Sequence, residues 1–285
     1  MPLLTIARLT IWEASRRRLL LAVVALTVVI IGMSAWGFVK IWDLNNGGRP
    51  VTVTEVRLIS SQLLILITFM FSFVLALSAV LLASFSLPGE VETGVVLALL
   101  ARPLRRAELV LGKWLGMAVL VVGYAVVAGS LEMLVIDFDT GYVPPHPIEL
   151  LVYVAVEGLV LLSLALLLST RLPGLAGGAI TAIAFLMAWI GGIVGGIGTA
   201  FGNQAIENVA IVSRLLLPTD ALWRGAVYSM EPATVLAVAR AAPPGASANP
   251  FLAREGQPVE MLLWIGFWFL AVIALSVWSF RTKEV

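Results

Sequence analysis

Residues 58–89 read LISSQLLILITFMFSFVLALSAVLLASFSLPG, and none of these side chains carries a charge. An α-helix rises about 1.5 Å per residue, so about 20 apolar residues cross the roughly 30 Å hydrocarbon core of a bilayer. The run is long enough for one membrane-spanning helix, which we predict at about 60–87.

Five further apolar stretches satisfy the same length criterion. They give predicted spans at residues 19–38, 114–136, 150–170, 173–200 and 260–280. Two of them, 114–136 and 150–170, each contain one glutamate. The sequence therefore predicts an all-α, polytopic integral membrane protein with six transmembrane helices in a single domain, residues 1–285.

The composition excludes a water-soluble fold. Hydrophobic residues make up 60% of the chain and charged residues 12%, with a mean hydropathy of +1.03, whereas soluble domains carry about 25% charge. Because the spans use about half of the 285 residues and the rest is divided among their connections and ends, an enzymatic or nucleotide-binding domain would have to come from another chain. The net charge of +1 gives no sign of a nucleic-acid partner, and the absence of cysteine excludes disulfides and Cys-based metal sites.

Lysine and arginine gather on one side of the predicted spans. That side holds Arg8, Arg16, Arg17, Arg18, Arg102, Arg105, Arg106, Lys113, Arg171, Arg281 and Lys283. The short segments on the other side hold only Lys40, Arg49 and Arg57. Because basic flanks remain cytoplasmic, we expect both termini in the cytoplasm.

Three segments outside the spans have a predicted role in the fold. Residues 3–17 carry an apolar stripe and precede the first span, as expected of a helix at the membrane interface or of a partly buried helix covered by protein and lipid headgroups. Residues 88–113 form the cytoplasmic connection after the second span. Residues 202–258 form a long external loop, in which 207–217 and 219–230 are predicted as two short helices separated by Pro218.

A search for catalytic groups finds no convergent set. Ser34 faintly resembles an intramembrane nucleophile, but the only histidine, His146, lies in a predicted external turn, so no base accompanies it. His146 with Asp137 and Asp139 could bind a metal on ligand type alone, although a loop histidine near acids is usually solvated. Gly112 and Lys113 lack the remainder of a phosphate-binding loop. We therefore predict no catalytic residue and no metal site.

Two features inside the spans are candidate functional positions. Glu132 and Glu157 are ionisable groups in the predicted outer half of the membrane, where such groups mark a functional path or a paired interior site. They either line a path for a cationic or hydroxyl-bearing substrate or form hydrogen-bonded structural contacts.

Glycines recur at four-residue spacing in the fifth span. Gly191 with Gly195 and Gly192 with Gly196 are typical of close helix packing. This indicates either a dimer interface or packing within one bundle, and we favour the interface.

The connections carry recognisable motifs: EVETG at 90–94, LLARPLRRAE at 99–108, LGKW at 111–114 and LLPTDALW at 216–223. Together with six spans, they resemble the ABC type-2 permeases, particularly the branch described as multi-copper enzyme maturation or multidrug-type permeases. Arg105 departs from the pattern, since many relatives have a small hydroxyl residue there.

The resemblance implies an ABC transporter permease that acts as an exporter and dimerises with a second permease copy or a homologue. It also implies two cytoplasmic ABC ATPase subunits that bind ATP and Mg, with no cofactor in this chain, and a bacterial or archaeal cytoplasmic membrane. The connection 88–113 would supply a coupling helix. We expect its contact residues to be Glu90, Glu92, Val96, Leu99 and Arg102.

Residue chemistry is compatible with that coupling role. The two glutamates suit a helix N-terminus, and the valine and leucine offer an apolar surface to a partner. The main alternative is a non-transporting regulatory or assembly subunit of a membrane complex. The substrate, and whether the dimer has identical subunits, stay open.

Overall fold

The computed structural model describes residues 2–15, 18–46, 49–84, 86, 105–242 and 249–282. Within these residues, six helices are long and apolar enough to cross a membrane, which confirms the all-α fold class with six predicted spans. They are α2 (Arg18–Ile41), α3 (Val53–Ser84), α6 (Arg106–Thr140), α7 (Pro147–Ser169), α8 (Gly174–Phe201) and α12 (Val259–Arg281). The shorter elements are α1 (Pro2–Ser15), α9 (Gln204–Leu216), α10 (Thr219–Met230), α11 (Ala233–Ala241) and the antiparallel strands β1 (Asn45–Asn46) and β2 (Arg49–Pro50).

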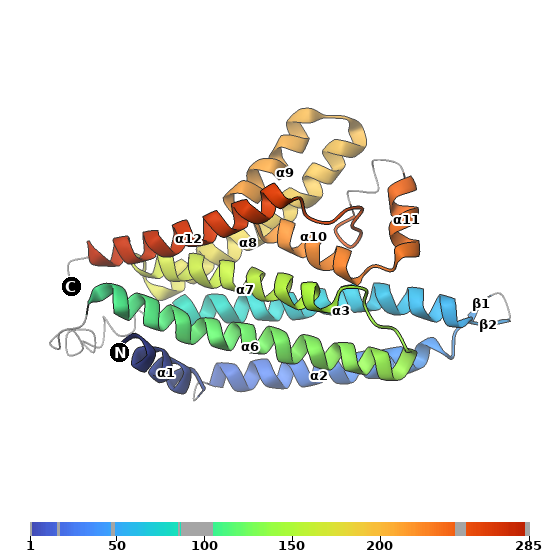
Figure 1. Cartoon of the computed structure of the whole chain (residues 1–285), viewed down its shortest axis with the longest axis horizontal. Coiled ribbons are helices and arrows are strands. Elements are labelled where there is room, and N and C mark those ends of the chain that lie inside the picture. The colour runs from blue at the N-terminus through green and yellow to red at the C-terminus, as the bar shows by residue number, and fades with distance from the viewer. Residues whose placement is uncertain are drawn as a thin grey trace.

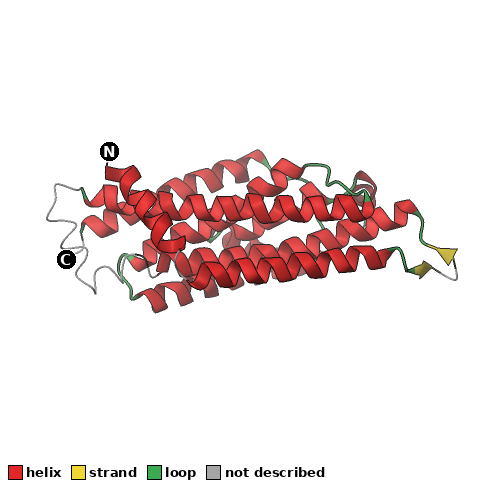
Figure 2. Cartoon of the chain, turned by 90° about the horizontal axis from the view of Figure 1, so that it is seen from below, coloured by secondary structure: helices red, strands yellow, loops and turns green. Residues whose placement is uncertain are grey.

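The long helices run roughly along one axis of the molecule (Figures 1 and 2). Helix α1 and the C-terminal end of α12 lie at one end of the bundle, and β1, β2 and α11 lie toward the other. This arrangement agrees with an even number of crossings. The identity of the cytoplasmic end stays a prediction.

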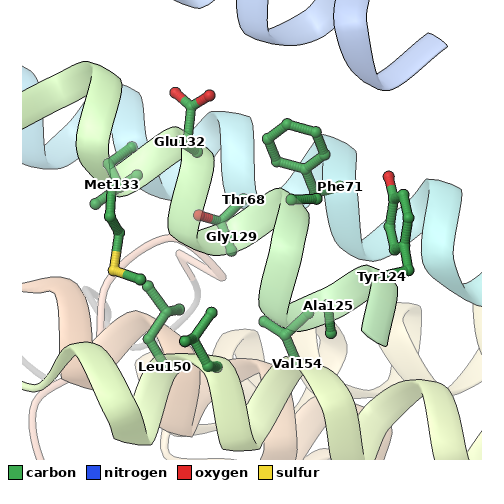
Figure 3. A pocket seen from close by; sticks show the side chains of 12 residues that line it. Thr68, Phe71, Tyr124, Ala125, Gly129, Glu132, Met133, Leu150 and Val154 are labelled. Atoms are coloured by element: carbon green, nitrogen blue, oxygen red, sulfur yellow. The ribbon is translucent and has the colours of Figure 1, made fainter. Parts of the chain in front are cut away.

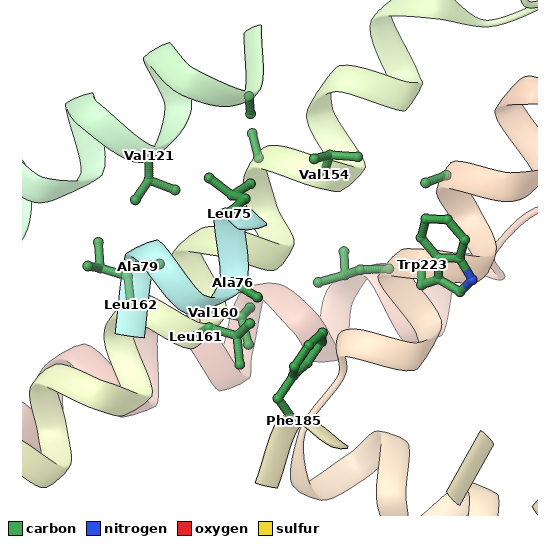
Figure 4. Close-up of a cluster of buried hydrophobic side chains, with 14 of the residues drawn as sticks. Leu75, Ala76, Ala79, Val121, Val154, Val160, Leu161, Leu162, Phe185 and Trp223 are labelled. Carbon is green, nitrogen blue, oxygen red and sulfur yellow. The ribbon is translucent and has the colours of Figure 1, made fainter. Parts of the chain in front are cut away.

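Helix α7 is the centre of the bundle, since it contacts α3, α6, α8, α10 and α12. Figure 4 shows the buried side chains that meet around it, among them Leu75 from α3, Val121 from α6, Phe185 from α8 and Trp223 from α10. Only 17% of the apolar window of α2 and of α12 is buried. These two helices therefore offer their apolar surfaces to lipid or to another subunit.

Helices α9 and α10 correspond to the two short helices predicted at 207–217 and 219–230. Helix α9 runs back along α8, and Trp268 of α12 donates its Nε1 hydrogen to the carbonyl of Leu216 at 2.9 Å. Trp268 lies nine residues beyond Val259, the start of α12, or about 14 Å along that helix. The sequence predicts an external loop here, whereas the structure packs the junction between α9 and α10 well inside the length of α12.

Candidate functional site

The predicted coupling residues Glu90, Glu92, Val96, Leu99 and Arg102 lie outside the described residues, so their role stays a prediction. The structure does describe the two helix ends that this segment connects. These are the C-terminal end of α3, with Ser86 just beyond it, and the N-terminal end of α6.

The N-terminal end of α6 is fixed by two polar contacts. The backbone N–H of Arg105 donates to Glu108 Oε2 at 3.0 Å, as in a capping box. Arg106 donates from Nη1 to the carbonyl oxygen of Arg281 at 3.1 Å, which ties the start of α6 to the end of α12. Arg105, the residue at which the sequence departs from the permease pattern, is therefore the N-cap residue of α6.

Lys113 links α6 to the chain just beyond the end of α3. Its side chain is buried, and its Nζ donates to the carbonyl oxygen of Ser86 at 2.8 Å. The sequence places Lys113 among the basic residues of the predicted cytoplasmic side. The structure instead buries this side chain. A buried ammonium group is tolerated when it donates hydrogen bonds to protein oxygens.

Helix α1 covers this region by packing directly on α6. A Cβ atom added at Gly112 would lie 2.8 Å from Ile6 Cβ, and one added at Gly116 would lie 2.6 Å from the carbonyl oxygen of Ala7. These two glycines therefore let the helices approach as small residues at four-residue spacing do. The predicted interfacial helix is thus seated in a groove of α6, with Ile6, Ala7 and Thr10 buried.

Glu132 of α6 is buried and accepts a hydrogen bond from Ser34 Oγ of α2 at 2.9 Å. Its carboxylate points away from Leu150 and Val154, which line the far side of the adjacent cavity (Figure 3). That cavity measures about 20 Å³, enough for about one water molecule.

Glu157 of α7 is buried as well and accepts from Ser72 Oγ of α3 at 2.5 Å. The two glutamates therefore bind serines on two different helices. These contacts agree with the structural alternative left open by the sequence, and a substrate path past either residue stays a prediction.

The glycine face of α8 is covered by the same chain. A side chain at Gly191 would meet Ser213 of α9, one at Gly192 would collide with the carboxylate of Asp220, and one at Gly195 would collide with Ala210. Gly196 is buried on the same helix. The same chain therefore already covers the face of α8 on which these glycines lie. Contact of this stretch with a second copy stays a prediction, and it would need another surface of α8.

Asp220 anchors a charge cluster that sequence reasoning missed as a site, although it lies within the LLPTDALW motif. Its carboxylate is 1% exposed, and Oδ2 accepts from Arg214 Nε at 2.7 Å and from Arg224 Nε at 3.2 Å. Arg224 also donates to the carbonyl of Gly192 at 3.2 Å. The cluster joins α8, α9 and α10, and only the tertiary fold brings these residues together.

Another buried acid, Glu231, lies where α10 ends. Glu231 accepts from the backbone N–H of Ala253 at 3.3 Å, and burial raises the pKa of this carboxyl group to about 7. Tyr142 donates to the carbonyl of Met230, and burial, together with the nearby Glu231 carboxylate, raises the pKa of the Tyr142 phenol. These contacts hold the segment before α12 against α10.

Comparison with known sequences places this architecture in a family. Residues 4–285 match the family described as ABC-2 family transporter protein, and the chain belongs to it. It is therefore a multi-pass membrane protein, a non-catalytic transmembrane subunit of the ABC-2 permease type. This confirms the resemblance carried by the motifs at 90–114 and 216–223.

One relative is the Probable ABC transporter permease protein NosY of Pseudomonas aeruginosa, which is 34% identical over 113 residues. The matched stretch covers 39% of this chain and spans 37% of the relative.

Proposed function

We propose that this permease exports a substrate across a bacterial or archaeal cytoplasmic membrane, with both termini in the cytoplasm. Two ABC ATPase subunits, which bind ATP and Mg, would drive it, and a second permease copy or a homologue would complete the complex. The family supports the pairing with ATPases, and the basic-residue asymmetry supports the orientation.

Within that proposal, residues 88–113 form the coupling element. The observation that supports this is the way in which the ends of the segment are built into the bundle. Lys113 binds the backbone at Ser86, Arg106 binds the end of α12, and α1 packs on Gly112 and Gly116. A displacement of the segment would therefore be transmitted to α1, α3, α6 and α12 together.

The test substitutes Glu92→Lys and Val96→Asp in the complex purified with its ATPase. The first change reverses a charge, and the second puts a carboxylate into an apolar contact, which costs several kcal/mol if it remains unpaired. We expect each variant to insert in the membrane normally but to lose ATPase copurification, or to hydrolyse ATP without transport.

Matched controls are available at the opposite end of the bundle. Glu149→Lys and Val143→Asp introduce the same changes at exposed positions and should leave coupling intact. If Glu92→Lys and Val96→Asp bind the ATPase and transport as the parent does, the segment is not the coupling element. If the ATPase copurifies but no substrate transport depends on it, the chain acts as a regulatory or assembly subunit.

A further inference from the structure

A cavity of about 410 Å³ lies between the α8–α9 pair, α10 and the segment that precedes α12. Its volume falls in the range of pockets that hold small ligands. Gly195, Gly196 and Thr199 form its α8 wall, and the two glycines expose backbone there. The other walls bring charged residues from three parts of the chain that are far apart in sequence.

Positive charge gathers on one side of this cavity. Arg214 and Arg224 both line it, and both direct Nε to the same oxygen of Asp220. One carboxylate thus stands between two guanidinium groups, so the cluster keeps an excess positive charge. Arg214 makes no other hydrogen bond to the residues that the structure describes, which leaves its terminal amino groups available to a ligand.

Arg254 adds a guanidinium group from the segment before α12, and its Nη2 also donates to the carbonyl oxygen of Ala242 at 3.1 Å. Planar guanidinium groups bind carboxylate and phosphate oxygens in pairs of parallel hydrogen bonds. This side of the cavity is therefore suited to an oxyanion.

Two carboxylates also line this cavity. Glu207 is one of them, seven residues before Arg214 on α9, so the two residues share a helix face and their backbones are separated by about 10 Å along the helix axis. Glu207 forms no ion pair with the residues that the structure describes. Glu255 is a second carboxylate on the wall, and it is exposed.

The cavity therefore offers guanidinium groups to an oxyanion and a carboxylate to an ammonium group, a combination that suits a zwitterion. We infer that this cavity binds a zwitterionic ligand, its oxyanion at Arg214 and Arg254 and its primary ammonium group at Glu207.

Two sources could supply such a group: the headgroup of an ethanolamine phospholipid and a small soluble zwitterion. Helix α9 exposes Val209, Val212 and Leu216 beside the cavity, and an exposed apolar face of this kind suits contact with lipid chains. The inference concerns binding alone and holds whether or not the chain transports the ligand.

The test measures binding to the purified protein by native mass spectrometry. The probes are phosphatidylethanolamine, phosphatidylglycerol and phosphatidylcholine, with soluble phosphoethanolamine as competitor. We expect the parent to prefer phosphatidylethanolamine, because phosphatidylglycerol lacks the ammonium group and phosphatidylcholine has no ammonium hydrogen to donate. Displacement of the lipid by phosphoethanolamine would show that the headgroup suffices, and binding of the diacyl lipid alone would identify lipid as the source.

Two substitutions separate the charges. Arg214→Gln should weaken binding of both phosphatidylethanolamine and phosphatidylglycerol about tenfold or more, because it removes a charge-assisted hydrogen bond. Glu207→Gln should leave phosphatidylglycerol binding intact and lower the preference for phosphatidylethanolamine by a similar factor. Arg57→Gln, on an exposed arginine of another cavity, should change neither.

Glu207→Gln keeps the inference testable even if loss of the Asp220 contact unfolds the Arg214 variant. Parent-like binding and lipid preference in both variants would overturn the inference, as would failure of the parent to bind phosphatidylethanolamine and phosphoethanolamine.

Discussion

Each buried acid in the described part of the bundle meets a hydrogen-bond donor from another element or loop. Ser34 donates a hydrogen bond to Glu132, Ser72 donates one to Glu157, and the amide of Ala253 donates one to Glu231. An unmatched buried polar group costs about 1–3 kcal/mol. These contacts therefore specify which helices and loops lie together as much as they stabilise them.

Glu231 gives the fold a defined response to pH. Its raised pKa, about 7, means that the folded chain holds this proton where the unfolded chain has released it. Stability from this group is therefore full below the unfolded pKa, about 4.5, and is lost as pH rises through about 7. We expect Glu231→Gln to remove this loss, worth roughly 3 kcal/mol at pH 8.

The measurement is the thermal midpoint of unfolding in detergent at pH 5 and pH 8. The difference between these two midpoints should be smaller in Glu231→Gln than in the parent. Glu260→Gln, at an exposed position at the start of α12, should keep the parental difference. A parental response in Glu231→Gln would show that this carboxyl group does not set the pH dependence.

At the scale of elements, apolar run length was sufficient to predict six spans but not where their helices end. The span predicted at 60–87 belongs to a helix that begins at Val53. The N–H of Thr52 donates to Glu55 Oε2 at 2.7 Å, and the N–H of Glu55 donates to Thr52 Oγ1 at 3.3 Å. Because this capping box stabilises helix outside the apolar run, hydropathy alone misses it.

The candidate sites likewise include features that the sequence shows and features that only the tertiary fold shows. Glu132 and Glu157 could be recognised from sequence, because a charge within an apolar run is visible there. Their serine partners could not be assigned, since residue spacing within a helix does not say which helices are neighbours. The burial of Lys113 and the pairing of Asp220 depend likewise on tertiary packing.

The packing of α8 on α9 gives a prediction about glycine. A leucine at Gly195 would collide with Ala210 of α9, so Gly195→Leu should lower stability by about 1–3 kcal/mol. Gly32→Leu is the matched control, because no atom lies within 4 Å of a Cβ added at Gly32. Thermal unfolding in detergent reports the stability of both variants.

Native mass analysis of the same samples reports their oligomeric state. If Gly195→Leu dissociates the permease at unchanged stability, these glycines serve contact between copies. The same stability in Gly195→Leu and Gly32→Leu would contradict the packing of α9 on α8.

At the scale of the whole molecule, the chain has two different ends. One carries α1, Lys113 and the base of the predicted coupling segment, and the other carries β1, β2 and α11 (Figure 1). The α8–α9 pair and the charged cavity connect to the second end through α10. If ATPase subunits engage the first end, the zwitterion cavity faces the outer leaflet.

This arrangement predicts a labelling pattern that the cysteine-free chain can report directly. Single cysteines replace the exposed residues Ser15 and Arg105 at one end, and Asp43 and His146 at the other. In intact cells, a membrane-impermeant maleimide should label Asp43→Cys and His146→Cys but reach Ser15→Cys and Arg105→Cys only after permeabilisation. The positive-inside rule sets this direction, since Arg105 lies in a short connection that also holds Arg102, Arg106 and Lys113. Labelling of the Asp43 and His146 positions from opposite sides would contradict the bundle itself. Labelling of both from the cytoplasm would keep the bundle, invert its orientation and move the Arg214 cavity to the inner leaflet.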